Sequence, residues 1–470
     1  MIKDNRLTTL DKISFVLLAV ALAIFTTAQG LMHNPDQDCH FLIDLGRYIV
    51  RNGSLPKTAY WLINPDVPTL IQQWLCDVCN YLAFAAAGYT GTIILGMIFS
   101  LILLGCMFIY CREITGSNQV GLNAAIYCWI LLGQFASTRP YSITIAITML
   151  ELTLLKRFFS KETHTRKETL MFFGGIAAVF VAQANWQASN IPYPMFWILS
   201  YIPQIKARKF RINLYALAAL GTGAVFSVVS PIGIKGPLFL TYVGDAFDGI
   251  EVHELQPPEF PSLYTAIMIM VAALFIYSIV KKKLTSEQFF LTVGCFAMSC
   301  VFMRCCWTLV IPMGSLLGNL NYTERTHKMM RWTYVAAGLL SVLLIMKYNV
   351  EKNNDREMMI AVVPPPDQVT LYTDFNSGSY FLIDEYKIYF DARPELYDER
   401  IAGDKAFRDE AYAAWSGEID YDEFIERYGF NWFAVSEDSY MEDYLKAHRE
   451  YEEVFINQKD KIVIYKKADQ

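Results

Sequence analysis

Long apolar segments recur through the first 350 residues and dictate where most of the chain must fold. A helix needs about 20 apolar residues to cross a bilayer, and eleven segments approach that length. They are 13–32, 92–111, 119–137, 140–158, 170–185, 190–204, 213–230, 262–280, 287–303, 305–320 and 331–348. Only 18% of the residues are charged and 54% are hydrophobic, which excludes a wholly soluble or disordered chain. The sequence therefore predicts a polytopic α-helical membrane protein with about 11 transmembrane helices.

The first apolar segment has an alternative interpretation as a cleaved signal peptide. Its apolar stretch is longer than the roughly 7–15 residues of a signal-peptide core, which favours a membrane span.

Basic residues lie in short connections that fall on one side of the membrane if the spans alternate. They are Lys3, Arg6 and Lys12, Arg112, Lys156 to Lys167, Lys206 to Arg211, Lys281 to Lys283, and Arg325 to Arg331. Short loops rich in Lys and Arg stay in the cytoplasm, so we predict a cytoplasmic N-terminus. The segments 33–91 and 231–261 and the C-terminal part would then lie outside.

The C-terminal part differs in composition from the apolar part. From Gln368 onward there are 24 acidic and 12 basic residues, a charge of −12, so the preceding part of the −6 chain carries +6. Strands are predicted at Val369–Thr373, Lys387–Phe390, Trp432–Val435 and Lys461–Tyr465, with helices at about 404–414, 421–428 and 438–447. We predict a transmembrane domain over 1–350, a Pro-rich linker over 351–367 and a soluble extracytoplasmic α/β domain over 368–470.

The first outer segment is predicted to contain two interfacial helices, over 38–51 and 71–87. In the first, His40, Asp44, Arg47 and Arg51 share one helical face and apolar side chains cover the other.

Motifs of common soluble enzymes are absent from the sequence. It has no phosphate-binding P-loop, no dinucleotide fingerprint, no H-E-x-x-H and no G-x-S-x-G. This argues against an ATP-driven pump and a serine esterase. Cys76 and Cys79 have neither the second cysteine pair nor the spaced histidines of a zinc site, which favours simple packing.

Acidic residues stand just after the first span. Asp36 and Asp38, followed by His40, could supply a general base and ligands for a divalent cation. The alternative is a helix N-cap with a solvated acid. His253 and Glu254 lie in the second long outer segment.

Other polar residues stand at outer ends of spans: Arg139, Asn185 with Gln187, and Arg304. Arginine at such a boundary suits a phosphate or pyrophosphate, although snorkelling to lipid head groups is an alternative. In the C-terminal part, Asp374, Asp391 and Arg393 adjoin predicted turns, and turn formation is the favoured interpretation for them.

Several separated motifs resemble those of the polytopic bacterial glycosyltransferases of the GT-C superfamily, in particular a group with a C-terminal soluble domain. They are Asp36 to His40, Gly46 to Ile49, Asn52-Gly53 with Pro56, Gln73 to Leu75, Arg139 to Tyr141, Glu254, Arg304 with Pro312, Asp374 to Tyr380, Asp391 to Tyr397 and Tyr428 to Trp432.

This resemblance implies inverting sugar transfer from a polyprenyl-phosphate-linked donor at the outer face of a bacterial cytoplasmic membrane. The product would be a cell-envelope glycan or glycolipid, and the acceptor a glycan, lipid or protein, without nucleic acid. Asp36 or Asp38 would be the catalytic base, and Arg139 or Arg304 would bind the donor phosphate. His40, Asn185, Gln187, His253 and Glu254 would line the substrate cavity; the cofactor is unknown, with a divalent metal on Asp36, Asp38, His40 and Glu254 possible.

Two other functions are compatible with the sequence. One is a transporter or flippase for a lipid-linked glycan, which would need a polar path between both membrane faces. The other is a catalytically silent receptor or scaffold that binds through its C-terminal domain.

Overall fold

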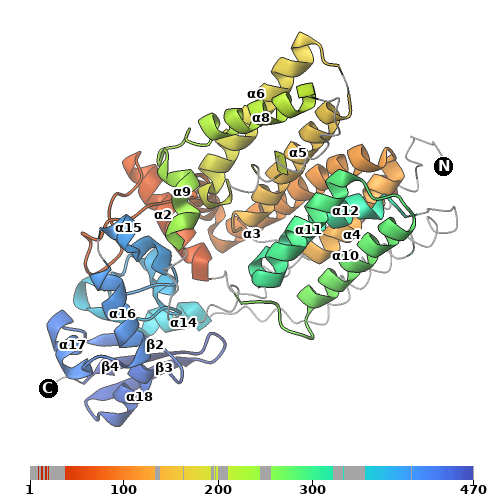
Figure 1. The fold of residues 1–470 in the computed structure, drawn as a ribbon. Coiled ribbons are helices and arrows are strands. Elements are labelled where there is room, and N and C mark those ends of the chain that lie inside the picture. The colour runs from red at the N-terminus through yellow and green to blue at the C-terminus, as the bar shows by residue number, and fades with distance from the viewer. Residues whose placement is uncertain are drawn as a thin grey trace. The chain divides into compact units, whose positions relative to one another are not determined.

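The computed structural model describes residues 37–132, 138–161, 163–191, 210–243, 256–320, 355–403 and 405–468, with scattered single positions elsewhere. These residues form two compact units, shown together in Figure 1. Unit 1 draws on 93–237 and 256–320. Unit 2 draws on 37–92, 238–243 and 355–468.

Unit 1 is built from apolar helices. They are the part of α3 (Trp74–Thr115) after Thr92, α4 (Asn118–Leu132), α5 (Tyr141–Phe159), α6 (Arg166–Trp186), η2 (Ala188–Asn190), α8 (Phe210–Phe226), α10 (Leu263–Val280), α11 (Ser286–Val301), η5 (Met303–Leu309) and α12 (Val310–Leu317). The short helix α9 (Lys235–Val243) follows α8 in the sequence. The helices α5, α6 and α8 pack in succession, and α6 and α8 run side by side in Figure 1.

Eight of the eleven predicted spans fall on these helices. The spans 13–32, 190–204 and 331–348 lie almost wholly outside the described residues. Within the described residues, α3 and α6 are long and apolar enough to cross a membrane, and shorter apolar helices lie at Leu214–Phe226, Tyr264–Val280, Ser286–Val301 and Cys305–Leu317. The total of about 11 transmembrane helices stays a prediction.

Helix α3 joins two segments of different character. Ala87 and Gly88 have non-helical backbone angles, with φ of 58° at Gly88. A positive φ is open to glycine at little steric cost, so the helix bends there. The bend separates the predicted interfacial segment, 71–87, from the predicted span, 92–111.

The helix ends of unit 1 are fixed by caps and by ion pairs. Helix α6 begins with a capping box between Thr165 and Glu168, the arrangement that satisfies two otherwise unpaired backbone donors. At the end of α5, Arg157 pairs with Glu113 at 2.6 Å and Lys156 pairs with Glu287 at 3.3 Å. These contacts bring the end of α3, the end of α5 and the start of α11 to the same end of unit 1.

The C-terminal part of unit 2 is a mixed sheet with short helices (Figure 1, blue). The strands are β1 (Leu371–Thr373), β2 (Trp432–Ser436), β3 (Tyr451–Asn457) and β4 (Ile462–Lys467), in the order β1-β2-β4-β3. Strands β1 and β2 are parallel, and the other pairs are antiparallel. The helical elements are α14 (Asp355–Val362), η6 (Pro366–Gln368), η7 (Gly378–Asp384), η8 (Pro394–Tyr397), α15 (Glu399–Ala402), α16 (Ala406–Ser416), α17 (Tyr421–Tyr428) and α18 (Tyr440–Ala447).

Three of the four predicted strands are confirmed, as β1, β2 and β4. The prediction of a strand at Lys387–Phe390 is wrong. Ile388 instead forms a single parallel bridge with Leu62 of the first outer segment. The stretch contacts β1 through the side chain of Thr373, which accepts from the backbone N–H groups of Tyr389 and Phe390 at 3.1 and 3.2 Å, so it forms no backbone ladder with the sheet. The sheet contains one strand that was not predicted, β3, an edge strand with Glu452 and Glu453 on its exposed positions.

Helix α2 (Gln37–Asn52) is the first predicted outer helix, and it packs against η7. Its apolar face is buried, with Phe41, Leu42 and Leu45 each no more than 2% exposed. The polar face is not solvated as an interfacial helix would require, since His40 and Asp44 are also buried. The pattern correctly predicted the helix, but the folded protein covers its apolar face and also His40 and Asp44 of its polar face, while Arg51 stays exposed.

Gly46 is the point at which α2 approaches the first segment of α3. A Cβ built on Gly46 would lie 2.1 Å from the backbone oxygen of Asp77 and 2.7 Å from the Cβ of Tyr81. Because backbone cannot move aside as a flexible side chain can, only glycine fits at this contact.

We expect Gly46→Ala to lower the midpoint of thermal unfolding of the detergent-purified protein, because over-packing costs about 1–3 kcal/mol. Gly105→Ala is the matched control, since a Cβ at Gly105 meets nothing within 4 Å and alanine favours the helix by up to ~1 kcal/mol. Equal midpoints for Gly46→Ala and the wild type would contradict the close approach of the two helices.

Candidate active site

Asp38 lies in the first turn of α2 and is about one-third exposed, with a side-chain exposure of 31%. Its carboxylate is 3.8 Å from Nη1 of Arg393, a residue of the C-terminal part of unit 2. The guanidinium of Arg393 also lies over the ring of Phe41, with 3.0 Å from Cζ to the ring centroid. The predicted base therefore has a buried cation beside it.

Arg393 is held in place by Asp391. Nη2 of Arg393 pairs with the Asp391 carboxylate at 3.0 Å and donates to the Ser379 hydroxyl at 3.2 Å. The backbone N–H of Arg393 also donates to Asp391 Oδ1 at 2.9 Å, which is an Asx-type turn. Within the described residues, Nε and Nη1 of Arg393 donate no hydrogen bond.

The buried Asp391 carboxylate joins the first outer segment to the C-terminal part. Trp61 Nε1–H donates to Asp391 Oδ2 at 3.2 Å, across 330 residues of sequence, and the Tyr397 hydroxyl donates to the same oxygen at 3.0 Å. Asp391 thus forms the predicted turn and has a second role in placing Arg393 next to Asp38.

Asp374 has a structural role. Its carboxylate accepts hydrogen bonds from the backbone N–H groups of Asn376 and Ser377, both at 3.0 Å, and of Ser436 at 2.5 Å. These bonds form the turn after β1 and tie it to the end of β2, as the turn interpretation predicts.

His40 lies one turn along α2 from the start of the helix and is buried. Its ring packs on Tyr380 at 5.2 Å and on Tyr89 at 6.0 Å between ring centroids. Within the described residues, no group of three or more His, Cys, Asp or Glu side chains could hold a metal ion. Two of the four predicted metal ligands, Asp36 and Glu254, lie outside the described residues, so the metal site on Asp36, Asp38, His40 and Glu254 stays a prediction.

Asp77 is a fully buried acid that sequence reasoning missed. It lies in the first segment of α3, and within the described residues neither carboxylate oxygen has a hydrogen-bond partner. The positive charge of Arg393 acts on it electrostatically. A signal was available, since Asp77 stands alone among apolar residues between Cys76 and Cys79.

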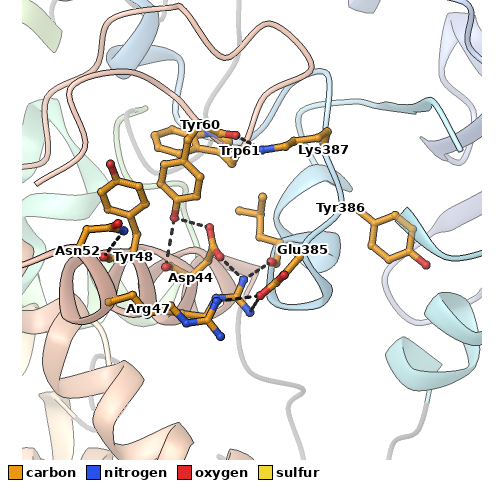
Figure 2. A pocket seen from close by; sticks show the side chains of 11 residues that line it. Asp44, Arg47, Tyr48, Asn52, Tyr60, Trp61, Glu385, Tyr386 and Lys387 are labelled. Carbon is orange, nitrogen blue, oxygen red and sulfur yellow. Dashed lines mark hydrogen bonds and ion pairs between the residues drawn. The ribbon is translucent and has the colours of Figure 1, made fainter. Parts of the chain in front are cut away.

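A polar pocket lies further along α2, and we name it the Tyr60 pocket (Figure 2). Its cavity of about 300 Å³ is lined by α2, the first outer segment and the region after η7, including Asp44, Arg47, Tyr48, Tyr60, Glu385 and Lys387. Arg47 pairs with Asp44 and donates to the backbone oxygens of Leu382 and Ile383.

The Asp44 carboxyl is the most deeply buried acid of this pocket. Burial raises its pKa above the usual value, although the charge of Arg47 and hydrogen bonds from Tyr60 and Arg47 act in the opposite direction. The Tyr60 hydroxyl donates to Asp44 Oδ2 at 2.7 Å. Burial and the neighbouring Asp44 charge also raise the pKa of Tyr60, so this hydroxyl keeps its proton.

Three predicted site residues lie in unit 1, where Trp186 links their segments by donating from Nε1 to the Pro140 oxygen at 2.8 Å. Arg139 directly precedes Pro140 and is half-buried, while Asn185 and Gln187 flank Trp186. The Gln187 side-chain oxygen accepts from Thr144 at 2.9 Å, and Asn185 donates to the backbone of Val181 and Val229.

The remaining predicted residues lie outside the described part of the chain. Asp36, His253 and Glu254 are not described, and for Arg304 the backbone is described, within η5, but not the side chain.

Comparisons with known proteins give a result for structure only. No protein-family model and no curated protein sequence matches the chain. Among solved structures, the chain is similar to a crystal structure of the Archaeoglobus fulgidus oligosaccharyltransferase tethered by a disulfide bond to an acceptor peptide with the NVT sequon. The TM-score is 0.58 at 10% sequence identity, over 90% of this chain and 69% of that chain.

The chain therefore resembles this oligosaccharyltransferase in fold. The resemblance drawn from the sequence motifs is thereby confirmed at the level of the fold. The apolar helices and this fold identify a membrane protein with a small C-terminal mixed sheet.

Asp398 follows Asp391 and Arg393 in the sequence and fixes the end of their segment. Asp398 caps α15 by accepting from the backbone N–H of Arg400 at 3.1 Å, and it pairs with the side chains of Arg400 at 2.7 Å and Arg408 at 3.2 Å. Burial acts to raise the pKa of Asp398, but the hydrogen bonds and charge of Arg400 and the charge of Arg408 outweigh it and lower that pKa.

We expect Asp398→Asn to lower the midpoint of thermal unfolding at neutral pH. A lowered pKa in the folded state stabilises the protein above the unfolded value of about 3.9, and this contribution is lost as the pH falls through the folded pKa. The difference between variant and wild type should therefore shrink as the pH falls below about 4, measured on the detergent-solubilised full chain. Asp66→Asn, at an exposed position, is the control. A difference that persists undiminished in acid would contradict the assignment.

Proposed function

We propose that the chain is an inverting glycosyltransferase that takes a sugar from a polyprenyl-phosphate donor at the outer face of a bacterial cytoplasmic membrane. The observation that carries the proposal is the GT-C fold over 90% of the chain. The placement of Asp38 supports it, because the first turn of α2 holds a partly exposed carboxylate beside a buried guanidinium.

The proposed chemistry needs one base and one stabiliser of the leaving group. The carboxylate of Asp38, or of Asp36, takes the proton of the acceptor hydroxyl while its oxygen attacks the anomeric carbon of the donor. The bond from that carbon to the phosphate oxygen breaks with inversion, and the phosphate leaves with the bonding electrons. Arg139 or Arg304 would offset the charge that develops on it. His40, Asn185, Gln187, His253 and Glu254 would shape the cavity.

Arg393 acts in this scheme as a positioning residue. Its guanidinium is fixed by Asp391 and by the ring of Phe41, so its charge stays beside the Asp38 carboxylate. Holding a reacting group in one orientation is worth a large share of an enzyme's rate. The C-terminal part would thereby take part in the reaction without touching the reacting atoms.

The partners of the proposed reaction are a lipid-linked donor and a glycan, lipid or protein acceptor, in the synthesis of a cell-envelope glycan or glycolipid. Two of the four predicted metal ligands lie outside the described residues, and no step is assigned to a metal ion. Transport of a lipid-linked glycan and a receptor or scaffold role are the alternatives, and both predict no sugar transfer by purified protein.

We expect Asp38→Asn to reduce sugar transfer by about 10²–10⁴-fold, the usual contribution of a general base. The assay follows radiolabelled polyprenyl-phosphate sugars in membranes that contain the protein, and the double variant Asp36→Asn/Asp38→Asn covers either acid as base. Asp66→Asn, an exposed acid of the same outer segment, should transfer sugar at the wild-type rate. Undiminished turnover by the double variant would refute the proposal.

We expect Arg393→Met to lower kcat by about 10²-fold with little change in the KM for donor, because misplacement of a reacting group affects the chemical step. Arg393→Lys should recover part of the lost kcat, since it restores the charge without the planar guanidinium. If both variants instead raised KM and left kcat unchanged, Arg393 would be a binding residue and its positioning role would be excluded.

A further inference from the structure

The Tyr60 pocket offers a ligand both hydrogen-bond donors and hydrogen-bond acceptors. Arg47, Arg51 and Lys387 carry positive charge at its walls, and Asp44 and Glu385 carry negative charge. Arg47 and Arg51 each contact Glu385 at 3.2 Å, so these charges largely cancel within the pocket. A balanced lining of this kind suits an uncharged ligand with many hydroxyl groups better than a free phosphate, which would call for unpaired cations.

Aromatic rings form part of the same wall. Tyr48 and Tyr60 stack with 4.4 Å between their ring centroids and an angle of 19° between their planes. Both residues are half-buried, and Figure 2 shows them above α2 on the side of Asn52. The hydrophobic face of a sugar ring packs well on such aromatic surfaces, while its hydroxyl groups reach the surrounding polar side chains. The lining has little aliphatic surface to take up an acyl chain.

The size of the cavity agrees with a small part of a glycan. A volume of about 300 Å³ is at the lower end of the range for ligand sites, and it would hold about one or two sugar rings. Two parts of the chain far apart in sequence form its walls, because Lys387 donates to the backbone oxygen of Tyr60 and Ile388 forms a bridge with Leu62. The cavity therefore exists only when both parts fold together.

The position of the pocket on α2 relates it to the proposed base. Asp44 lies six residues after Asp38 on the same helix, a distance of about 9 Å along the helix axis. Six residues also turn the helix by about 240°, so a glycan chain with one end at Asp38 would have to pass around α2 to reach the pocket.

We propose that the Tyr60 pocket is a carbohydrate subsite that holds an uncharged sugar unit of the acceptor glycan. The identification of this sugar as part of the acceptor rests on the proposed function. The pocket itself belongs to unit 2 alone, so sugar binding can be measured without catalysis.

The test measures binding of the full-length protein in detergent to a printed array of uncharged oligosaccharides. The best-bound glycan is then titrated by calorimetry. We expect Tyr48→Ala and Asn52→Ala to weaken its affinity at least about tenfold, which corresponds to ~1.4 kcal/mol. Tyr440→Ala, at an exposed tyrosine of α18, is the matched control and should bind normally. Tyr48→Phe keeps the stacked ring and should retain most of the affinity.

The outcomes separate this inference from the proposed function. Asp38→Asn should bind the glycan like the wild type although it transfers little sugar. If the wild-type protein bound the glycan but had no transferase activity, the pocket would be supported and the proposed function contradicted. If Tyr48→Ala and Asn52→Ala transfer sugar with the wild-type KM for the acceptor, the pocket assignment is wrong. The proposed function would not be affected by that result. The assignment also fails if the wild type binds no glycan on the array, or if the two variants lose binding only to vesicles of anionic phospholipid.

Discussion

A guanidinium buried as deeply as that of Arg393 must keep its counter-charges close, because an unpaired charge inside a protein is costly. Asp391 supplies the first counter-charge and is itself held by Trp61 and Tyr397. Asp38 supplies the second, from α2. This network joins the first outer segment and the C-terminal part within one compact unit.

The C-terminal part therefore contributes directly to the candidate site. It is not merely attached after the last helix, since its turns provide the cation beside Asp38 and one wall of the Tyr60 pocket. The helical scaffold resembles that of the oligosaccharyltransferase. The specific surroundings of Asp38 come from residues of the small mixed domain, which is where acceptor choice would be made under the proposed function.

Helices and apolar spans followed closely from the sequence because their signals are local: periodicity, length and turn residues. Strand β3 was missed because its exposed glutamates obscure the alternation expected of a strand. The stretch at Lys387–Phe390 was taken for a sheet strand because its composition suits one, yet it pairs with Leu62. Pairing partners distant in sequence are set by tertiary packing, which composition does not encode.

The sequence by itself determined that the chain enters a membrane, where its helices lie, and that Asp38 and His40 open the first outer helix. The tertiary structure decided what surrounds them. It buried His40 against Tyr380, placed Arg393 at Asp38, and left Asp77 inside the protein. The contacts of His40 and Asp38 join residues hundreds of positions apart in the sequence. The contact between Arg393 and Asp38 is favoured because a buried charge needs a partner, and that need arises only once the chain is folded.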